Sequence, residues 1–345
     1  MPGDPEDEQM DPRGGGGARR QWRIAMVGCG GFARLYHLPA LLADPRAGLT
    51  VVCDPAPAEE TRRLAQEAGA SLTGELTDLW SPDVCEAVIV SSPHGLHQTH
   101  VRATLAARRH VLVDKPFVLR STEAHDLAAK ALVRGLVNAV AFNRRFDPGS
   151  LRARAIIGSG GLGPIRHVET VQLGYPRSGW LLDPELGGGG PFVGRGAHVA
   201  DLIPWLTGQR PRRVRGRILP GEPGQVDAGG FIECEFDGFA CAMTLLARGL
   251  DTWDEIRVFG DEGFVELRRP LGWPLGWEMV RLDARGHRVE SVAPDPALGQ
   301  ATRNFLDALE GKAAPACTFA EAWLSVRMIE AAYQSAGGVG DWIDV

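Results

Sequence analysis

The stretch Ile24–Ala33, IAMVGCGGFA, decides how the rest of the chain is interpreted. A short apolar run reaches Val27, and a glycine cluster of the form G-x-G-x-x-A follows at once, before a helical pattern that continues to about Ala43. In such a strand-turn-helix the first glycine permits a tight turn, the second lets the backbone approach a pyrophosphate, and the small last residue lets the helix pack on the strand. The stretch therefore predicts a dinucleotide site, and its candidate residues are Gly28, Gly30, Gly31, Phe32 and Ala33.

The next apolar run, Leu49–Cys53, ends in Asp54. An acidic residue at this place accepts a hydrogen bond from the 2'-hydroxyl of the adenosine ribose and repels a 2'-phosphate. The neighbouring Pro55 offers no charge to that phosphate, although Arg62 and Arg63 lie one helix further along. We therefore expect NAD as the cofactor, with NADP less favoured.

Two further apolar runs, Ala87–Val90 and Val111–Val113, each lead into polar residues and then into a helical pattern. Strands that alternate with helices in this way predict an α/β domain with a doubly wound parallel sheet, a Rossmann domain. Ligands of such sheets bind at the carboxyl ends of the strands. The candidate cofactor contacts at or just after these ends are Ser92, Pro93, His94, His97, Asp114 and Lys115.

Length, charge and cysteine content bound the possible functions. The 345 residues exceed what one hydrophobic core usually supports, and a net charge of -6 disfavours nucleic acid and anionic membranes as partners. The six cysteines form no C-x-x-C pair, which argues against a metal site, and no run approaches the roughly 18 apolar residues of a membrane helix. We expect a cytoplasmic protein with a disordered tail over residues 1–20, which are acidic and Gly-rich.

A second Gly-rich segment, residues 187–201 with the sequence GGGGPFVGRGAHVAD, is a further candidate for chemistry. Its glycines permit close approach to a ligand. A helix is predicted to begin near Ala197, because apolar residues then recur at helical spacing until Gly208. His198 and Asp201 are three residues apart on that helix and share a face.

In these segments the chain resembles the Gfo/Idh/MocA oxidoreductases, the group of glucose-fructose oxidoreductase and inositol dehydrogenase. Besides the G-x-G-x-x-A turn, Ser92–His97 corresponds to the T-P-x-x-x-H of that family, Asp114–Pro116 to its E-K-P, and residues 188–201 to its Gly-rich segment ending in H-x-x-D. Ala141–Phe146 resembles the end of the cofactor domain, and Ala331–Ala336 resembles the closing helix. The resemblance extends over nearly everything from residue 22 onward.

The resemblance implies a cofactor domain over residues 21–143 and a substrate-binding and oligomerisation domain of α+β type over residues 144–345, with an open, mostly antiparallel sheet. The residues beyond Gly163 agree with this, because their apolar runs come in hairpin-like pairs joined by turn residues. The runs are Ile165–Leu173, Phe231–Phe236 with Ala240–Leu246, Glu255–Phe259 with Phe264–Leu267, and Met279–Leu282 with Val289–Val292. Helices expected over Gln300–Glu310 and Phe319–Ser335 could pack back on the first domain. A large open sheet face usually meets a second subunit, so we expect a homo-oligomer, a dimer or a tetramer.

The resemblance also implies hydride transfer between nicotinamide and a carbinol or keto carbon of a sugar, cyclitol or related polyol. Lys115 would act as general acid or base, and His198 would meet the substrate beside it. A lysine can do this near neutral pH only if its pKa is lowered, which a partly desolvated pocket favours. The remaining candidate substrate contacts are Asn143, Arg195 and Asp201.

One position departs from the family pattern, since Gly194 stands where inositol-dehydrogenase-like members have an aspartate. Either Lys115 and His198 suffice, or Asp183 replaces the aspartate, or the site has changed its substrate or lost its chemistry. Arg195 could hold an anionic or keto-bearing substrate. The alternatives to a sugar or cyclitol dehydrogenase are a non-catalytic NAD(H)-binding sensor or subunit, and a reductase of a biosynthetic keto-sugar or an imine.

Overall fold

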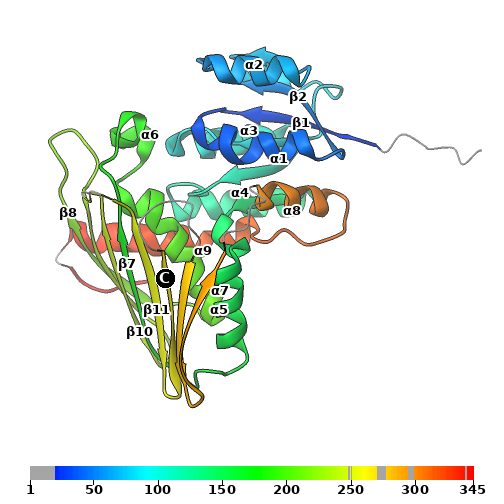
Figure 1. Cartoon of the computed structure of the whole chain (residues 1–345). Helices are drawn as coiled ribbons and strands as arrows, with labels where there is room; N and C mark the ends of the chain where they lie inside the picture. The colour runs from blue at the N-terminus through cyan, green and yellow to red at the C-terminus, as the bar shows by residue number, and fades with distance from the viewer. Residues whose placement is uncertain (1–19, 248, 250, 270–276, 294–298, 339) are drawn as a thin grey trace, which may run out of the picture.

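The computed structural model describes residues 20–247, 249, 251–269, 277–293, 299–338 and 340–345, so the tail expected over residues 1–20 lies almost wholly outside the described residues. Two lobes, each built on one sheet, make up this part of the chain (Figure 1). The six cysteines are all buried and unpaired. In the described ranges, no helix is long and apolar enough to pass through a membrane.

The first sheet confirms the predicted Rossmann domain. Six parallel strands lie in the order β3-β2-β1-β4-β5-β6. They are β1 (Trp22–Val27), β2 (Ala47–Cys53), β3 (Ser71–Thr73), β4 (Ala87–Val90), β5 (His110–Asp114) and β6 (Asn138–Ala141). All four residues of β4 are fully buried, as expected for a parallel strand covered on both faces.

Helices and short helical turns connect these strands. The turns are η1 (Ala33–His37), η2 (Leu76–Leu79) and η3 (His94–Leu96), and the helices are α1 (Leu38–Ala43), α2 (Glu59–Glu67), α3 (His97–Ala106) and α4 (Ser121–Val133). The sheet order reverses between β1 and β4, which are neighbours. Ligands of open α/β sheets bind at such a switch point, at the carboxyl ends of the strands.

The second sheet has nine strands in the order β14-β13-β12-β11-β7-β10-β9-β8-β15. They are β7 (Ile165–Leu173), β8 (Arg213–Leu219), β9 (Gly229–Glu235), β10 (Ala240–Leu246), β11 (Trp253–Gly260), β12 (Gly263–Arg269), β13 (Trp277–Asp283), β14 (Gly286–Val292) and β15 (Ile343–Asp344). The three predicted hairpins are confirmed as β9-β10, β11-β12 and β13-β14. β7 and β10 pair in parallel and all other neighbours are antiparallel, so the sheet is mostly antiparallel.

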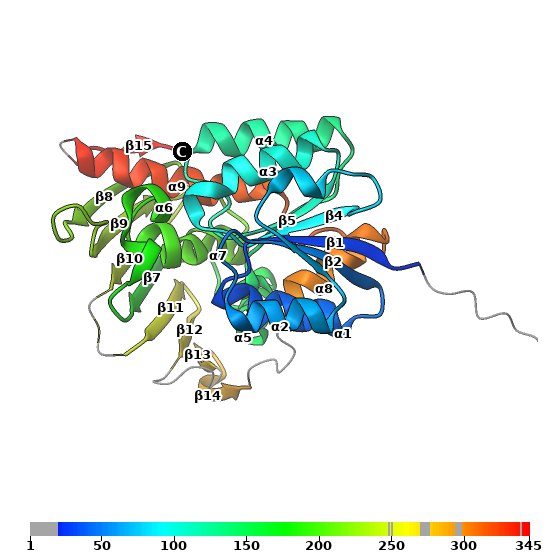
Figure 2. The ribbon, with the colours of Figure 1, turned by 90° about the horizontal axis from the view of Figure 1, so that it is seen from above.

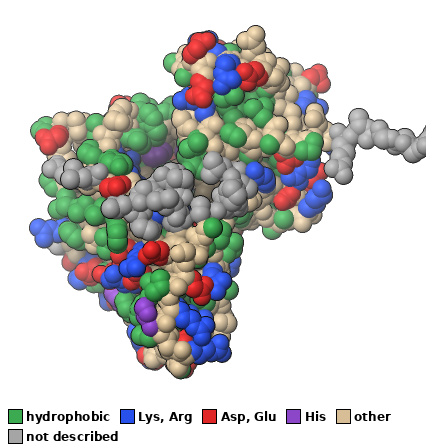
Figure 3. All heavy atoms as spheres, in the orientation of Figure 1, with side chains coloured by type: hydrophobic (Ala, Val, Ile, Leu, Met, Phe, Trp, Pro, Cys, Tyr) green, Lys and Arg blue, Asp and Glu red, His purple; other side chains and the backbone are tan. Residues whose placement is uncertain are grey.

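One face of this sheet is open and carries ion pairs between neighbouring strands. Arg215 on β8 pairs with Glu233 on β9, and Arg257 on β11 pairs with Glu266 on β12. Figure 3 shows positive and negative side chains intermixed over this lobe, with no large area of one sign on the side it displays. Among the large apolar side chains of the open face, Phe231 is 45% exposed.

Most of the remaining helices cover the other face of the second sheet or join the lobes, and one of them packs on the first lobe. They are η4 (Asn143–Phe146), α5 (Pro148–Gly158), η5 (Gly179–Leu182), α6 (Pro184–Gly187), η6 (Phe192–Gly196), α7 (Ala197–Thr207), α8 (Gln300–Leu309) and α9 (Phe319–Gly337). A capping box between Thr318 and Glu321 begins α9, which lies against both α4 and β8 (Figure 2). α8 packs on α1, and its Phe305 and Leu306 are fully buried in the core of the first lobe.

Candidate functional site

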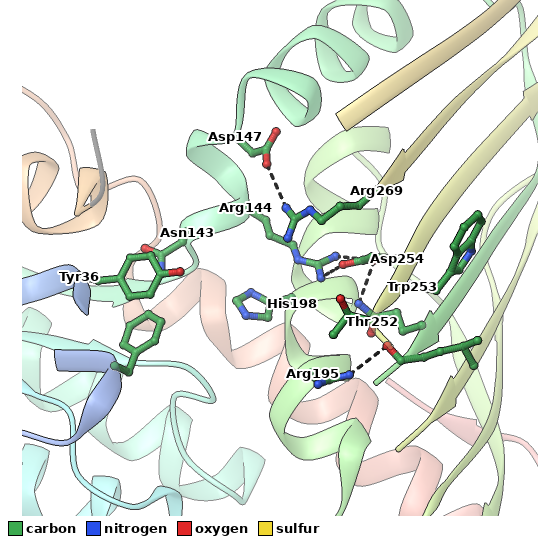
Figure 4. Close-up of a pocket in the computed structure, with 13 residues that line it drawn as sticks. Tyr36, Asn143, Arg144, Asp147, Arg195, His198, Thr252, Trp253, Asp254 and Arg269 are labelled. Atoms are coloured by element: carbon green, nitrogen blue, oxygen red, sulfur yellow. Dashed lines mark hydrogen bonds and ion pairs between the residues drawn. The ribbon is translucent and has the colours of Figure 1, made fainter. Parts of the chain in front are cut away.

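A cavity of about 300 Å³ lies between the two lobes. Its lining residues are Phe32, Tyr36, Asn143, Arg144, Asp147, Gln172, Leu173, Arg195, His198, Thr252, Trp253, Asp254 and Arg269. Figure 4 shows His198 in the middle, with Tyr36 and Asn143 on one side and the arginines of the second lobe on the other. The cavity thus brings together three sequence-predicted substrate contacts, namely Asn143, Arg195 and His198.

The glycine turn after β1 fits a dinucleotide. Gly28 has a φ of +76°, and a Cβ added there would lie 2.7 Å from the Cα of Ser92, so no other residue fits without strain. A Cβ added to Gly30 or Gly31 would meet nothing within 4 Å, so the space beside these residues is open. The chain becomes helical at Gly31 and continues through η1. A bare backbone with free space before a helix N-terminus is what a pyrophosphate needs.

Asp54 and Phe32 border this turn. Asp54 directly follows β2, and its carboxylate accepts a hydrogen bond of 2.9 Å from the amide of Cys29. This contact fixes the carboxylate beside the glycine turn, the place expected for the ribose. Phe32 stacks on Tyr36 with ring centroids 4.4 Å apart, and both rings line the cavity.

The residues after β4 are tied to the end of β5 through a histidine. His97 is fully buried, with Nδ1 2.7 Å from the carbonyl oxygen of Pro116 and Nε2 2.9 Å from that of Ser92. Its neighbour His94 has Nδ1 3.1 Å from the carbonyl oxygen of Gly187. Burial, and then the charge of Lys115, hold the pKa of His94 well below its usual value. His94 is therefore a neutral residue that joins the Rossmann loop to the second Gly-rich segment.

Asp114 is the centre of a buried hydrogen-bond network. One carboxylate oxygen lies 2.9 Å from Nε2 of His37, and the other accepts from the hydroxyl of Ser91. The Nδ1 of His37 lies 2.8 Å from the hydroxyl of Thr302 on α8. Burial would raise the pKa of Asp114, but His37 and Ser91 outweigh it and hold the pKa below the usual value. Asp114 therefore stays charged directly before Lys115 without lining the cavity.

Lys115 donates a hydrogen bond of 3.1 Å from Nζ to the carbonyl oxygen of Gly194. Burial lowers the pKa of its ammonium group to about 8. Nearby charges modulate this value, upward from Asp114 and downward from Arg177, Arg144 and Arg195. A pKa near 8 suits a group that exchanges protons at neutral pH.

His198 lies in the first turn of α7, and its Nδ1 is buried without a hydrogen-bond partner among the described residues. Burial, and then the charge of Lys115, hold its pKa well below the usual value, so the ring is neutral. Asp201, one turn further on, does not contact it. Both oxygens of Asp201 accept from the guanidinium of Arg145, at 2.6 and 2.9 Å, so this carboxylate belongs to a buried ion pair beside the site.

The carboxylates near the cavity already have partners. Asp254 accepts from Arg144 and, at 3.1 Å, from Gln172. Asp147 caps α5 and pairs with Arg269. Asp183 caps α6 by accepting from two backbone amides, so it does not stand in for an aspartate at position 194.

Sequence reasoning missed several lining residues. Tyr36, Asp254 and Arg269 reach the cavity from a helical turn and two strands whose patterns indicated only packing, and Thr252 reaches it from the loop before β11. The one available signal was charge at strand ends, since Asp254 stands at the start of β11 and Arg269 at the end of β12. Among the described residues, no three His, Cys, Asp or Glu side chains are grouped closely enough to hold a metal ion.

Comparison with known proteins finds a matching family model for each half of the chain. Residues 22–142 match the GFO/IDH/MocA oxidoreductase family with its NAD-binding Rossmann fold, and residues 150–266 match the GFO/IDH/MocA C-terminal domain. The 1-carboxy-3-chloro-3,4-dihydroxycyclohexa-1,5-diene dehydrogenase of Comamonas testosteroni is 32% identical over 54% of this chain and 47% of its own length. The rhizopine catabolism protein MocA of Rhizobium meliloti is 27% identical over 88% of this chain and 94% of its own.

Solved structures agree with these sequence matches. GenD2 from gentamicin A biosynthesis, in complex with NAD, is 27% identical with a TM-score of 0.81, over 98% of this chain and 99% of that one. The chain spans about half the length of several curated relatives that it matches.

Proposed function

Because the chain belongs to the GFO/IDH/MocA family of oxidoreductases, we propose that it exchanges a hydride between a nicotinamide cofactor and a carbinol or keto carbon of a polyhydroxylated ring compound, a sugar, a cyclitol or a related polyol. The bound nicotinamide supplies the hydride chemistry. The protein's own residues must hold the substrate and move the proton of its hydroxyl group. The single observation that carries the proposal is Lys115, a partly buried lysine with a pKa of about 8, at the end of β5 and beside the cavity.

Lys115 is the proton-transfer group in this proposal. In oxidation its neutral amine takes the proton of the hydroxyl group, and in reduction its ammonium form returns one. The hydrogen bond to the Gly194 carbonyl keeps Nζ in place while still leaving two other N–H or lone-pair positions for the substrate. Asp114, which directly precedes Lys115, is held by its hydrogen bond with His37, and this fixes the backbone that carries the lysine.

His198 contacts the substrate hydroxyl in the same proposal. Its ring is neutral and lines the cavity, so it can donate or accept a hydrogen bond without changing charge. Asn143 and Arg195 line the same cavity and are further substrate contacts. Asp201 contributes by holding Arg145, which fixes α7 and therefore the position of His198.

The cofactor is held by Gly28–Ala33 and Asp54, with Ser92, Pro93, His94 and His97 shaping the loop after β4. We propose NAD over NADP, because the carboxylate of Asp54 beside the turn repels a 2'-phosphate. Relatives support a dinucleotide in this place, since GenD2 was crystallised with NAD. The ring substrate is supported by the Comamonas relative, whose name describes a dihydroxylated six-membered ring.

The two lobes have different roles in this proposal. Residues 21–143 form the domain that binds the cofactor, and residues 144–345 form the domain that binds the substrate and other subunits. We propose that two or four copies associate through the open face of the second sheet, where Phe231 is 45% exposed among the strand-to-strand ion pairs. Light scattering of the purified protein tests this, and a monomer at micromolar concentration would contradict it.

The competing candidate is a non-catalytic NAD(H)-binding protein, which the glycine at position 194 favours. The test follows the nicotinamide absorbance band while the protein is mixed with NAD or NADH and a panel of sugars, cyclitols and their keto forms. In the Lys115→Met variant, turnover falls by about 100- to 10,000-fold while cofactor binding is kept. The matched control is Lys312→Met, which removes an exposed lysine. Cofactor binding without turnover would support the non-catalytic protein, whereas equal turnover in Lys115→Met would refute the role of Lys115 as the proton-transfer group.

A further inference from the structure

Gly194 has no side chain, and the space where the family's aspartate would lie is filled by a positively charged side chain. A Cβ added to Gly194 would lie 2.2 Å from Nη2 and 2.9 Å from Cζ of Arg177. The guanidinium of Arg177 therefore occupies the space that an aspartate at position 194 would need. The carbonyl of the same glycine accepts the hydrogen bond from Lys115. A positive group thus stands close to the proposed reacting lysine, in the place where a carboxylate was expected.

A second guanidinium lies over another glycine in the same way. A Cβ added to Gly174 would lie 1.0 Å from Nη1 of Arg195. The same nitrogen donates to the carbonyl of Leu173 at 3.0 Å, and this is the one hydrogen bond that Arg195 makes within the described part of the chain. Arg195 lines the cavity together with His198. It forms no ion pair with a carboxylate of the described residues, and Asp254 acts on it only from a distance.

Arg177 is partly buried, and it makes no hydrogen bond or ion pair with any described residue. Burial, and then repulsion from Arg195, lower the pKa of Arg177 to about 10. Asp227 is the carboxylate whose charge acts on Arg177. It already accepts hydrogen bonds from the amides of Gly190 and Gly229 and from the hydroxyl of Tyr333. Asp254, which attracts Arg195, is bound by Arg144 and Gln172.

Partly desolvated guanidinium groups without a counter-charge are costly, and a carboxylate or phosphate is their best partner. The glycine turn that fits the pyrophosphate of the cofactor is in the first lobe, whereas Arg177 and Arg195 come from the second lobe, beside Lys115 and His198. We propose that the substrate carries an anionic group, which Arg177 and Arg195 bind while Lys115 and His198 meet the reacting hydroxyl. This inference rests on the proposed function and narrows its substrate to acidic polyols, such as uronic acids or sugar phosphates.

The test uses matched sets of neutral and anionic polyols, for example D-glucose, D-glucuronate and D-glucose 6-phosphate, with their cyclitol counterparts. Turnover is measured with NAD and NADP, and binding to the NADH-loaded protein is measured by calorimetry. We expect kcat/KM to be at least about 10-fold higher for the anionic members, and to fall with ionic strength. Comparison of the carboxylate with the phosphate identifies which anion the two arginines take.

Four variants locate the preference. Arg177→Gln reduces the anionic-to-neutral ratio of kcat/KM by about 10-fold or more, because it removes one of the two guanidinium groups. Gly194→Asp reduces it similarly, because the new carboxylate pairs with Arg177, whereas Gly194→Ala displaces the guanidinium without neutralising it and reduces the ratio less. Arg166→Gln, at the opposite end of β7 in an exposed pair with Asp261, is the control and keeps the wild-type ratio.

The outcomes separate this inference from the proposed function. Equal or better turnover of neutral polyols overturns the inference and leaves the oxidoreductase intact. Arg177-dependent binding of anionic polyols without any turnover supports the inference and overturns the oxidoreductase. Inorganic phosphate that binds as tightly as the anionic polyols overturns the inference, since the arginines would then hold a free anion. Absence of both turnover and anion-dependent binding overturns both.

Discussion

The pKa of Lys115 makes a quantitative prediction about the pH dependence of the reaction. With a pKa of about 8, roughly a tenth of the lysine is neutral at pH 7, half at pH 8 and nine-tenths at pH 9. If the neutral amine is the base in oxidation, kcat/KM rises about 10-fold between pH 7 and pH 9 and is half-maximal near pH 8. For reduction the ammonium form is needed, so the profile falls over the same interval.

Two substitutions move this midpoint in opposite directions. Removal of the negative charge in Asp114→Asn stabilises the neutral amine, because Asp114 raises the pKa of Lys115, so the midpoint shifts below pH 8. Removal of the positive charge in Arg177→Gln stabilises the ammonium form, so the midpoint shifts above pH 8. The wild-type profile alone does not identify the group that titrates. The two opposite shifts do, because they depend on the positions of the Asp114 and Arg177 charges relative to Lys115.

The assay is the initial rate of nicotinamide reduction from about pH 6.5 to about pH 9.5, at constant ionic strength and with a substrate well below its KM. Calorimetric titration of the cofactor at each pH removes any contribution from NAD binding. A flat profile would refute the assignment of Lys115 as the base. So would an upward shift in Asp114→Asn, or the same sigmoidal profile in Lys115→Met.

Three other substitutions test the cofactor turn and the packing around the site. Gly28→Ala places a methyl group 2.7 Å from Ser92 at a φ of +76°, so we expect a loss of about 1–3 kcal/mol in the free energy of unfolding and weaker NAD binding, measured by denaturant titration and NADH fluorescence. Unchanged values in both would show that the turn is not tightly packed. Arg145→Ala leaves Asp201 buried without its partner, which costs about 3–5 kcal/mol of stability in the same titration, whereas Arg63→Ala, in an exposed pair, stays within about 1 kcal/mol of wild type. Asp54→Ala removes the charge that repels a 2'-phosphate, so the ratio of the dissociation constants for NADP and NAD falls by about 10-fold; an unchanged ratio argues against a role for Asp54 in cofactor choice.

The sequence predicted those features that depend on local patterns. The turn at Gly28 and the strand end at Asp54 follow from apolar periodicity and glycine placement, and both stand where they were expected. The helix expected from about Ala197 begins earlier, because η6 (Phe192–Gly196) continues into α7 without a break. The hairpins of the second sheet were equally readable, because Asp237–Gly238 and Asp261–Gly263 mark the turns between their strands.

Contacts between residues far apart in the chain could not be read in the same way. Arg144 and Asp254 are separated by 110 residues, and His37 and Thr302 by 265, so no spacing rule connects them. The sequence did reveal that Gly194 lacks the expected carboxylate. It did not reveal that Arg177 fills the vacated volume, because that requires the path of the chain after β7.

The position of α8 has a consequence for how the protein folds as it is synthesised. Phe305 and Leu306 complete the core of the first lobe, and Thr302 completes the hydrogen bonds of His37. These residues leave the ribosome about 160 residues after Asn143, a delay of roughly 8–32 s at 5–20 residues per second. Throughout that interval the nascent first lobe lacks part of its core, so a fragment that ends at Asn143 exposes the apolar surface that α8 covers in the whole chain.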